Sequence, residues 1–455
     1  MKYLTSFLFI FAVSFSPKVR AVQCPIPNCP AGQLCFCPPP PPHYLVLDFK
    51  TGNLDTKARK ILVEHMTNNF DMTAIFKLKK SYKPRGYKSS TPVDQIPRWS
   101  VIKIDALKNG TGIDFRIEYH ERFPSHSRKS ILKWKTNLKI RHQNETTLRN
   151  ALDAISNQCM AKILGRKFDA FGSRLAYVET LSVGKSVIRV SAVNGKSYKT
   201  AGSYGKLLSF SRSLNKEPAW SNGNRYIVFT SHIRYNPDLY IVKSDGSKSP
   251  HRISARKGMN HAAAFSPDNT RLALTMDYKG NPDIYLLHSE FNSTRKWRVA
   301  KKLTKHHNID TSPVFSPDGK KIAFVSARRG NAQIYIKHLS TGKITRLLST
   351  SNRTFTPKWC KSGNREYIAF TQLVGNRSVI YIYNVLTRAG WQATSTSAPN
   401  AENPTWSPHC NLLAYESAGS KTAAAGIRLS PVQGGSSRLV LSGKLSMPAW
   451  ETKKK

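Results

Sequence analysis

The chain has 455 residues, of which 40% are hydrophobic and 10% aromatic, so it can form two or three domains and is not wholly disordered. Its 71 Lys and Arg residues against 26 Asp and Glu give a formal net charge of +45, spread along the whole chain. Such a field attracts nucleic acid, lipopolysaccharide or an anionic membrane surface, although a solvated basic surface without a dedicated site is the simpler explanation.

Residues 1–21 have the features of a signal peptide. Lys2 gives a positive start, and Phe7–Phe15 is an apolar stretch too short to span a bilayer. Val19-Arg20-Ala21 precedes the expected cleavage site, after Ala21. We therefore expect the mature protein to be exported and soluble.

Residues 22–42 are rich in cysteine and proline. Four cysteines (Cys24, Cys29, Cys35 and Cys37) precede the run Pro38–Pro42, which predicts an extended polyproline II spacer. In an oxidising compartment the four cysteines allow three pairings, and the sequence does not choose among them. A zinc site fits less well, because no second CxxC pattern completes it. The other cysteines (Cys159, Cys360 and Cys410) lie in periodic segments and are expected to be small buried residues.

Residues 43–165 predict a small N-terminal α+β domain. The expected elements are a strand over His43–Phe49, a helix over Leu54–Phe70, a strand–turn–strand unit over Ser100–Glu121 and a helix over Asn144–Gly165. Asp55 is the expected N-cap of the first helix, and Gly165 ends the second. Asn109-Gly110 supplies the bend between the two strands.

Residues 166–455 contain an internal repeat, best seen in "SPVFSPDGKKIAFVSARRGNAQIYIKHL". Each copy has an aromatic residue, a polar turn, a strand like "IAFVS" and a second strand with Tyr. The anchor aromatics are spaced by 45, 50, 44 and 47 residues: Trp220, Phe265, Phe315, Trp359 and Trp406. This interval is typical of a four-stranded propeller blade and too long for 33–34-residue helical repeats.

The two ends of this region complement each other. Residues 171–195 supply strands without an aromatic start, and "MPAWE" supplies an aromatic start without a blade. We expect the strand at Trp450 to join the blade that begins near Leu175, which gives an all-β six-bladed β-propeller without open edges. The anchor aromatics are expected to pack between blades and not to form a ligand cage.

Residues 43–450 resemble the TolB family, the exported propeller proteins of the Tol–Pal system in Gram-negative envelopes. The resemblance is most specific in "LGRKFDAFGSRLAYVE" (Leu164–Glu179), "GMNHAAAFSPDNTRLALTMDYKGNPDIYLL" (Gly258–Leu287) and "NIDTSPVFSPDGKKIAFVSARRGNAQIYI" (Asn308–Ile336). It implies a periplasmic binding protein without catalytic residues or cofactors. The implied partners are a Pal-like lipoprotein, at the mouth of the channel, and the inner-membrane Tol proteins, at the N-terminal region.

By this resemblance, the partner-binding residues precede the blade aromatics: Met259, Asn260, His261, Ala262, Asn308, Asp310 and Thr311. Two departures leave the exact contacts open. His261-Ala262-Ala263 replaces a pattern richer in Gly and Pro, and Ser312 stands where an acid is common. The Cys-rich segment also occupies the place of the family's mature N-terminal peptide, so signalling through that peptide is expected to differ or be absent.

An enzyme fits the sequence poorly. Similar blades precede serine peptidases, but no Gly-x-Ser-x-Gly motif occurs here. Asp268 and Asp318 are explained by turns, which leaves no carboxylate pair for glycoside chemistry. His306-His307 lacks an HExxH context, so a polar loop is expected there and no metal site.

A basic polyanion-binding propeller is the alternative function, and its ligand would be lipopolysaccharide or nucleic acid. Lys301-Lys302, Lys320-Lys321 and Arg328-Arg329 are charge clusters without interleaved aromatics. They fit a basic surface that contacts an anionic membrane peripherally better than a base-stacking groove, so no specific nucleic acid is expected.

Overall fold

The structure is a computed structural model. It describes residues 43–72, 76–78, 99–110, 112–122, 131–141, 144–193, 199–200, 203–254, 256, 258–277, 280–289, 297–348, 350–395, 398–420, 423–432 and 437–452. The predicted signal peptide (1–21) and the Cys/Pro-rich segment (22–42) lie outside these residues, as does any pairing of the four cysteines there. No helix in the described ranges is long and apolar enough to cross a membrane.

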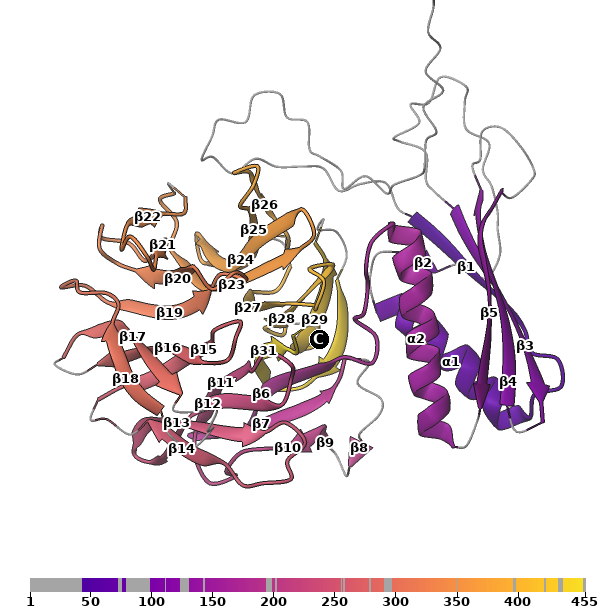
Figure 1. Cartoon of the computed structure of the whole chain (residues 1–455), viewed down its shortest axis with the longest axis horizontal. Coiled ribbons are helices and arrows are strands. Elements are labelled where there is room, and N and C mark those ends of the chain that lie inside the picture. Colours follow the sequence, from indigo (N-terminus) through magenta and orange to yellow (C-terminus); the bar gives the residue numbers. More distant parts are fainter. Residues whose placement is uncertain are drawn as a thin grey trace, which may run out of the picture.

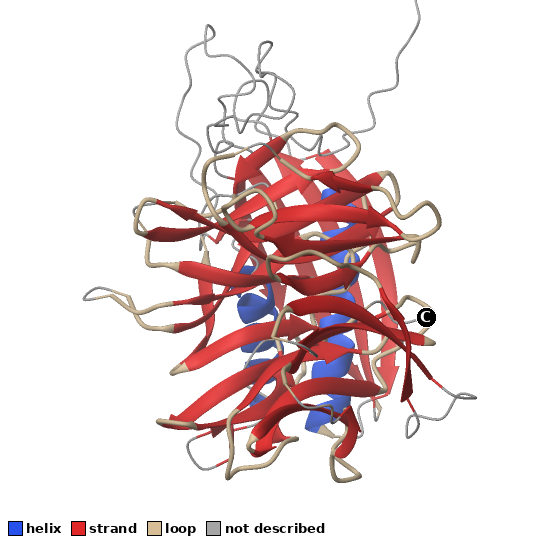
Figure 2. Ribbon diagram, turned by 90° about the vertical axis from the view of Figure 1, so that its left-hand side faces the viewer, coloured by secondary structure: helices blue, strands red, loops and turns tan. Residues whose placement is uncertain are grey.

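The N-terminal part is a five-stranded sheet covered by two helices (Figure 1). The strands lie in the order β2-β1-β3-β4-β5, and β1 is parallel to both of its neighbours. The elements are β1 (His43–Lys50), α1 (Thr56–Met72), β2 (Phe76–Leu78), β3 (Trp99–Asn109), β4 (Gly112–Arg122), β5 (Ile131–Arg141) and α2 (Glu145–Leu164). In Figure 1 both helices lie between this sheet and the remaining sheets, and Figure 2 shows them behind the strands of the latter.

The helix ends form where the sequence predicted them. The carboxylate of Asp55 accepts a hydrogen bond from Ala58 N at 2.7 Å, and Asn144 Oδ1 accepts one from Thr147 N at 2.9 Å, so both side chains satisfy free N–H groups in a first turn. Gly165 ends α2 in the left-handed conformation, with φ of 62°. Gly110, with φ of 57°, makes the bend between β3 and β4.

The strands that follow form six four-stranded sheets within the described residues, numbered here in chain order. Sheet 1 has the order β10-β7-β6-β31. Between β7 and β10 in the chain, β8 (Lys199–Thr200) and β9 (Ser203–Tyr204) form a separate two-stranded ribbon. Its strands are β6 (Arg174–Ser182), β7 (Lys185–Ala192), β10 (Lys206–Leu207) and β31 (Leu445–Trp450). In sheets 2 to 6 the four strands follow one another in sequence, and all pair antiparallel with their neighbours.

The bounds of these consecutive strands follow the repeat. Sheet 2 consists of β11 (Asn215–Trp220), β12 (Tyr226–Arg234), β13 (Asn236–Lys243) and β14 (His251–Ser254), and sheet 3 of β15 (Asn260–Phe265), β16 (Arg271–Asp277), β17 (Pro282–Ser289) and β18 (Trp297–Lys302). Sheet 4 consists of β19 (Asp310–Phe315), β20 (Lys321–Ser326), β21 (Gln333–His338) and β22 (Ile344–Arg346). Sheet 5 consists of β23 (Thr354–Ser362), β24 (Arg365–Val374), β25 (Arg377–Asn384) and β26 (Gly390–Gln392), and sheet 6 of β27 (Ala401–Trp406), β28 (Leu412–Ser417), β29 (Gly426–Pro431) and β30 (Arg438–Ser442).

Sheet 1 joins the two ends of this region. The last strand, β31, pairs antiparallel with β6, and Trp450 lies opposite Leu175, as the sequence predicted. Trp450 Nε1 donates to Ser173 Oγ at 2.7 Å, and Arg174 forms an ion pair of 2.9 Å with Glu451, whose side chain is buried. Residues almost 280 positions apart therefore hold the first and last strands together.

The anchor aromatics pack in the core. Four anchor tryptophans are buried, and two of them donate hydrogen bonds to the backbone of the preceding sheet. Trp220 Nε1 donates to the carbonyl of Ala449 at 2.8 Å, and Trp406 Nε1 donates to that of Lys358 at 2.9 Å. Their place between sheets agrees with the predicted packing role, because a ring that stacks on a ligand must be accessible to it.

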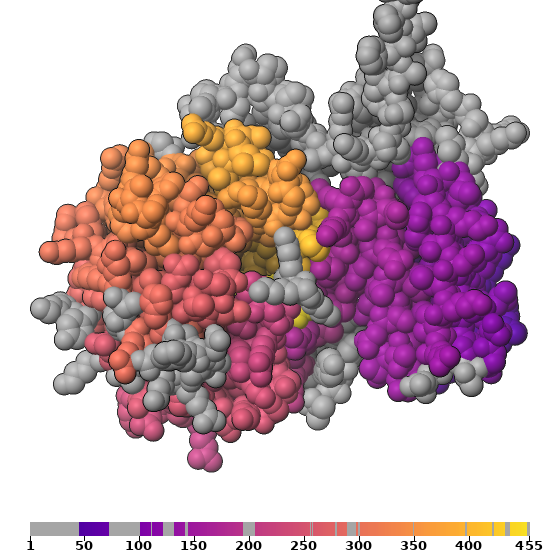
Figure 3. Space-filling view, in the orientation of Figure 1, coloured from indigo at the N-terminus to yellow at the C-terminus, as the bar shows by residue number. Residues whose placement is uncertain are grey.

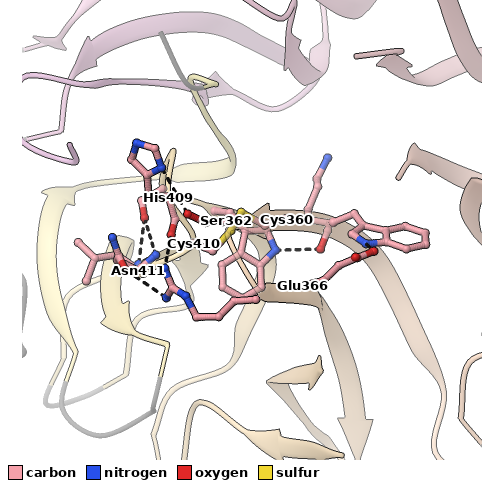
Figure 4. The surroundings of a disulfide bond; sticks show 12 residues. Cys360, Ser362, Glu366, His409, Cys410 and Asn411 are labelled. Atoms are coloured by element: carbon pink, nitrogen blue, oxygen red, sulfur yellow. Dashed lines mark hydrogen bonds between the residues drawn. A yellow bond between two sulfur atoms is a disulfide. The ribbon is translucent and has the colours of Figure 1, made fainter. Parts of the chain in front are cut away.

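Cys360 and Cys410 form a disulfide between sheets 5 and 6 (Figure 4). Both side chains are buried, as predicted, and they form a disulfide that the sequence analysis did not predict. The two cysteines are 50 residues apart, about one repeat, so the fold places them in neighbouring sheets with Cα atoms at 5.9 Å. Cys159 remains a free thiol in α2, and burial raises its pKa to about 12.

The N-terminal part packs against sheet 6 and sheet 1 (Figure 3). One hydrophobic cluster runs from the helices, through Phe168 and Phe171, to Leu412 and Trp450. At its edge, Asn411 Nδ2 donates to the carbonyl of Lys167 at 2.7 Å. The junction segment that follows α2 is therefore part of the shared core.

Candidate partner-binding site at the channel mouth

The innermost strands of the six sheets surround one central cavity. The cavity has a volume of about 110 Å³, and all six strands β11, β15, β19, β23, β27 and β31 contribute to its wall. Hydrogen bonds or shared hydrophobic clusters connect each sheet with the next, and sheet 6 with sheet 1. The sequence repeat thus places the same strand of each copy around one axis.

Each innermost strand contains the same bulge. One residue per strand has a φ between 47° and 56°, and the strand register shifts there: Glu217, Ala262, Ser312, Thr356, Asn403 and Met447. None of these residues is glycine, and proline follows all except Ala262. A left-handed conformation is costly for such residues and persists only where the surroundings fix it. All six line the cavity.

Side chains of the preceding sheet hold four of these bulges. Glu217 Oε2 accepts a hydrogen bond from Ala262 N at 2.7 Å, and Glu416 Oε2 accepts one from Met447 N at 2.7 Å. Thr275 Oγ1 and Thr371 Oγ1 do the same for Ser312 N and Asn403 N, at 3.2 and 3.1 Å. The wall of the channel is therefore built from contacts between sheets, which keeps it rigid.

Two of the seven predicted partner-binding residues lie inside the loops. Asn260 and Asp310 are both fully buried. Asn260 Nδ2 donates to the carbonyl of Arg256 at 2.6 Å, and Asp310 accepts two hydrogen bonds from Arg328 Nη2 at 3.0 and 3.2 Å. Each occupies the first position of its innermost strand. Asn260 holds the segment before β15, and Asp310 holds the β20–β21 hairpin, which contains Arg328. Asn260 and Asp310 hold the segments at the mouth in place and do not contribute to its exposed surface.

Three more of the predicted residues contact the preceding sheet or line the cavity. His261 Nδ1 lies 3.2 Å from Glu217 Oε1, and Thr311 Oγ1 lies 3.2 Å from Thr275 Oγ1. Ala262 lines the cavity itself. The structure therefore places His261, Ala262 and Thr311 at the boundary between adjacent sheets.

Met259 is the most exposed of the predicted residues, at 39%, and Asn308 is partly exposed, as are His261, Ala262 and Thr311. Asn308 Nδ2 donates to the carbonyl of Ala327, and its backbone N–H donates to His306 Nδ1, both at 3.1 Å. The imidazoles of His306 and His307 stack on each other at 4.2 Å. No group of three metal-ligating side chains occurs in the described part of the chain.

The sequence analysis missed further apolar residues at this mouth. Ile309, next to Asn308, is 52% exposed, and Tyr235 is 98% exposed. Val183, in the β6–β7 hairpin, is also exposed. Tyr235 lies in the β12–β13 hairpin. This hairpin and the β6–β7 hairpin lie at the end of the sheets where the innermost strands begin, because Asn215, the first residue of β11, pairs with Ser231, and Leu445, the first residue of β31, pairs with Glu179. In the sequence, an apolar residue inside an otherwise polar hairpin could have indicated these exposed positions.

Basic residues lie at the same end of the sheets as these apolar side chains. Exposed cationic side chains at the same end of the sheets are Arg212, Arg234, Lys305, Arg329, Arg353 and Arg377. The mouth thus combines exposed apolar groups with a cationic rim, which suits a partner surface that is apolar at its centre and acidic around it.

The comparisons with known proteins identify a family. The family model for the TolB β-propeller domain matches residues 161–454. TolB from Acinetobacter baumannii has a similar structure, with a TM-score of 0.65 and 21% identity over 91% of this chain and 98% of that chain. A protein assigned as a TolB of Agrobacterium tumefaciens shares 20% identity over 59% of this chain and 88% of its own, with a TM-score of 0.44. No curated protein sequence matches significantly. Because the family model covers more than half of the residues, the chain belongs to the TolB β-propeller family.

Proposed function

We propose that this protein is a non-enzymatic scaffold of a Tol–Pal system, whose six sheets are the blades of one closed propeller. Its channel mouth binds a Pal-like lipoprotein, and its N-terminal α+β domain (43–165) communicates with inner-membrane Tol proteins. In this role it links the two membranes and supports envelope integrity and cell division. Membership of the TolB family supports this proposal.

The rigid mouth is the observation that carries the proposal. Six bulges face one channel, and side chains from neighbouring sheets hold four of them. Asn260 and Asp310 fix the loops above from within. A surface that is ordered before binding loses little entropy on docking, so modest contacts suffice for specific capture.

The periplasm is the proposed location. Besides the predicted signal peptide (1–21), the disulfide Cys360–Cys410 supports it, because disulfides persist in oxidising compartments and are rare in the cytosol of mesophiles. Four further cysteines in residues 22–42 fit the same setting.

The net charge of +45 keeps polyanion binding as a second candidate. Some members of the basic clusters are already neutralised: Lys302 pairs with Asp283 at 2.6 Å, and Arg328 pairs with Asp310. The two candidates differ in salt dependence. Affinity for heparin, DNA or lipopolysaccharide falls steeply with salt, whereas docking centred on apolar contacts changes less.

The test measures binding to the purified Pal-like lipoprotein of the same organism by calorimetry. Met259→Asp and Ile309→Asp each place a charge in the exposed apolar part of the mouth, and we expect each to weaken binding by about tenfold or more. Leu386→Asp is the matched control, because Leu386 is 57% exposed in the β25–β26 loop at the opposite end. Its affinity should equal that of the wild type. Equal affinities for all three variants would refute the assigned surface, and binding that disappears at 0.3 M salt for every variant would favour the polyanion candidate.

A further inference from the structure

The sheet of the N-terminal part ends in a long strand edge. β5 (Ile131–Arg141) is the outermost strand of the order β2-β1-β3-β4-β5, and it pairs with β4 alone. Among the described residues, its backbone forms no hydrogen bond to any other segment. In an antiparallel pair every second residue points its N–H and C=O away from the partner strand. About half of the backbone groups of β5 are therefore available to a further strand.

The length of this edge is unusual for the molecule. β5 has 11 residues, whereas β2, at the other edge of the same sheet, has three, and the outermost strands of the six blade sheets have two to six. Short edge strands limit the pairing of a sheet with other chains. From Trp134 to Arg141, neither a bulge nor a proline interrupts β5. The β5 edge can therefore accept a strand of useful length.

The two faces of the sheet differ along β5. The face toward the helices carries half-buried apolar side chains that pack against the hydrophobic cluster: Trp134, Leu138 and Ile140. The opposite face carries exposed polar and cationic side chains: Lys135, Asn137, Lys139 and Arg141. Because side chains of a strand alternate between the two faces, an added strand would meet apolar groups on one face and cations on the other.

The cations of this face have no acidic partner in the described part of the chain. Glu118 and Asp114 of β4 lie opposite the two lysines. However, Glu118 Oε1 already accepts a hydrogen bond from Arg116 Nη2 at 2.9 Å. Asp114 Oδ2 accepts one from Asn109 Nδ2, also at 2.9 Å. Neither lysine nor Arg141 forms an ion pair with a described residue. Acidic residues on an added strand would give these cations their counter-charges.

The charge of the β5 edge decides which kind of chain fits it. Two copies of β5 would place basic side chains against each other, and like charges on facing strands repel. The net charge of +45 opposes such self-association further. Residues 22–42, which precede this sheet in the chain, contain no acidic residue, and residues 79–98, which follow β2, contain one acid against six bases. An acidic segment of another protein is the occupant that matches.

We propose that the β5 edge binds an extended acidic segment of a partner protein, which pairs with β5 as a sixth strand. Its acidic side chains lie over Lys135, Lys139 and Arg141, and its apolar side chains cover Trp134 and Leu138. The backbone hydrogen bonds supply affinity, and the alternation of acidic and apolar residues supplies specificity. The inference rests on the proposed role of the N-terminal domain in contacting another protein, and it states which sequence pattern that partner presents.

The experiment titrates the full chain with a capped peptide of about ten residues that alternates glutamate and valine, and it follows binding by fluorescence anisotropy. In the control peptide, two central valines are replaced by proline, which has no N–H to donate and disfavours strand pairing. Both peptides carry the same charge, so general attraction to the basic surface contributes equally to both. We expect the control peptide to bind about tenfold more weakly or worse.

Two double variants test the cations. Lys135→Thr with Lys139→Thr should weaken binding of the acidic peptide by about tenfold and should still fold, because threonine is favourable in strands. Lys248→Thr with Lys343→Thr is the matched control, since it removes the same charge from exposed loops of sheets 2 and 4. Its affinity should equal that of the wild type. Circular dichroism with heating should give both variants the wild-type unfolding midpoint.

Hydrogen exchange with mass spectrometry locates the bound peptide. The acidic peptide should protect the amides of residues 131–141, and its proline form should not. The proposal fails if the acidic peptide does not bind, if both peptides bind equally, or if protection appears only outside β5. A wild-type dimer that the Lys135→Thr, Lys139→Thr variant does not form would assign the edge to a second copy and would also overturn it. Lipoprotein binding at the channel mouth, measured separately with the Met259 and Ile309 variants, does not depend on any of these outcomes.

Discussion

Sheets 4 and 1 reach the same four-stranded geometry by different routes. Sheet 4 uses one continuous stretch, and the turn Ser316–Lys321 between its first strands is held locally: Lys320 N donates to Asp318 Oδ1 at 3.0 Å. Sheet 1 takes β31 from the far end of the chain, and contacts between residues 277 positions apart hold it. Local turn chemistry therefore specifies one sheet, whereas the other depends on completion of the whole ring.

Removing β31 should have the largest effect. Deletion of residues 445–455 leaves β6 with an open edge and removes Trp450 and Glu451 from the core. We expect a loss of about 5 kcal/mol or more, comparable with the whole stability of many domains, and therefore no cooperative unfolding transition. Circular dichroism with heating measures this. Deletion of residues 453–455 alone is the control and should leave the transition unchanged; a cooperative transition in the longer deletion would contradict the role of closure.

Single anchors sharpen the comparison between the two sheets. Trp450→Ala in sheet 1 and Phe315→Ala in sheet 4 both empty a buried site, and each should lower the free energy of unfolding by about 3–5 kcal/mol. Trp450 also donates to Ser173 Oγ, so its loss leaves a buried hydroxyl without this partner and should cost more. Urea denaturation of both variants tests the order, and a larger loss for Phe315→Ala would argue against the long-range anchor.

The disulfide gives a covalent counterpart to the closure of sheet 1. It joins sheets 5 and 6 across 50 residues, so the double variant Cys360→Ser, Cys410→Ser should lower the free energy of unfolding by about 2–4 kcal/mol. Reductant should destabilise the wild type by a similar amount and leave the double variant unchanged. Cys159→Ala, which removes the free buried thiol, serves as the control and should retain its response to reductant.

The smallest expected effect concerns Glu416, which connects sheet 6 with β31. Burial raises the pKa of this carboxyl in spite of hydrogen bonds from Met447 N and Asn403 Nδ2. A raised folded-state pKa means that the folded protein binds the proton more tightly, so this contribution to stability is present at low pH and declines as the pH rises above about 4.5. Wild type should therefore lose stability relative to Glu416→Gln between pH 4 and pH 7. Glu145 should behave in the opposite way, because a hydrogen bond from Arg149 lowers its pKa: the wild type should gain stability relative to Glu145→Gln as the pH rises toward about 4.5.

The repeat was visible in the sequence because each copy carries its own signals. The turn residues around Asp318 and the aromatic at Phe315 recur at intervals typical of blades, and the unmatched ends near Leu175 and Trp450 indicated the closing pair. The helix caps Asp55 and Gly165 were predictable for the same reason, since their partners lie within a few residues.

Features that depend on neighbouring copies were not predictable from one copy. The Cys360–Cys410 pair becomes apparent only when the repeats are placed side by side, because Cys360 follows its anchor by one residue and Cys410 follows its anchor by four. Asn260 and Asp310 look like exposed loop residues, yet their position at the first residue of an innermost strand buries them.

The pairing of β31 with β6 also imposes an order of events on biosynthesis. Because synthesis runs from the N-terminus, β31, which completes the first sheet, is made after all the other strands of the six sheets. Until then the edge of β6 and the core around Leu175 stay uncovered, and exposed edges of this kind recruit other chains. A prematurely terminated product is therefore a hazard to the cell and not a smaller scaffold, so its rapid proteolysis is the safe outcome.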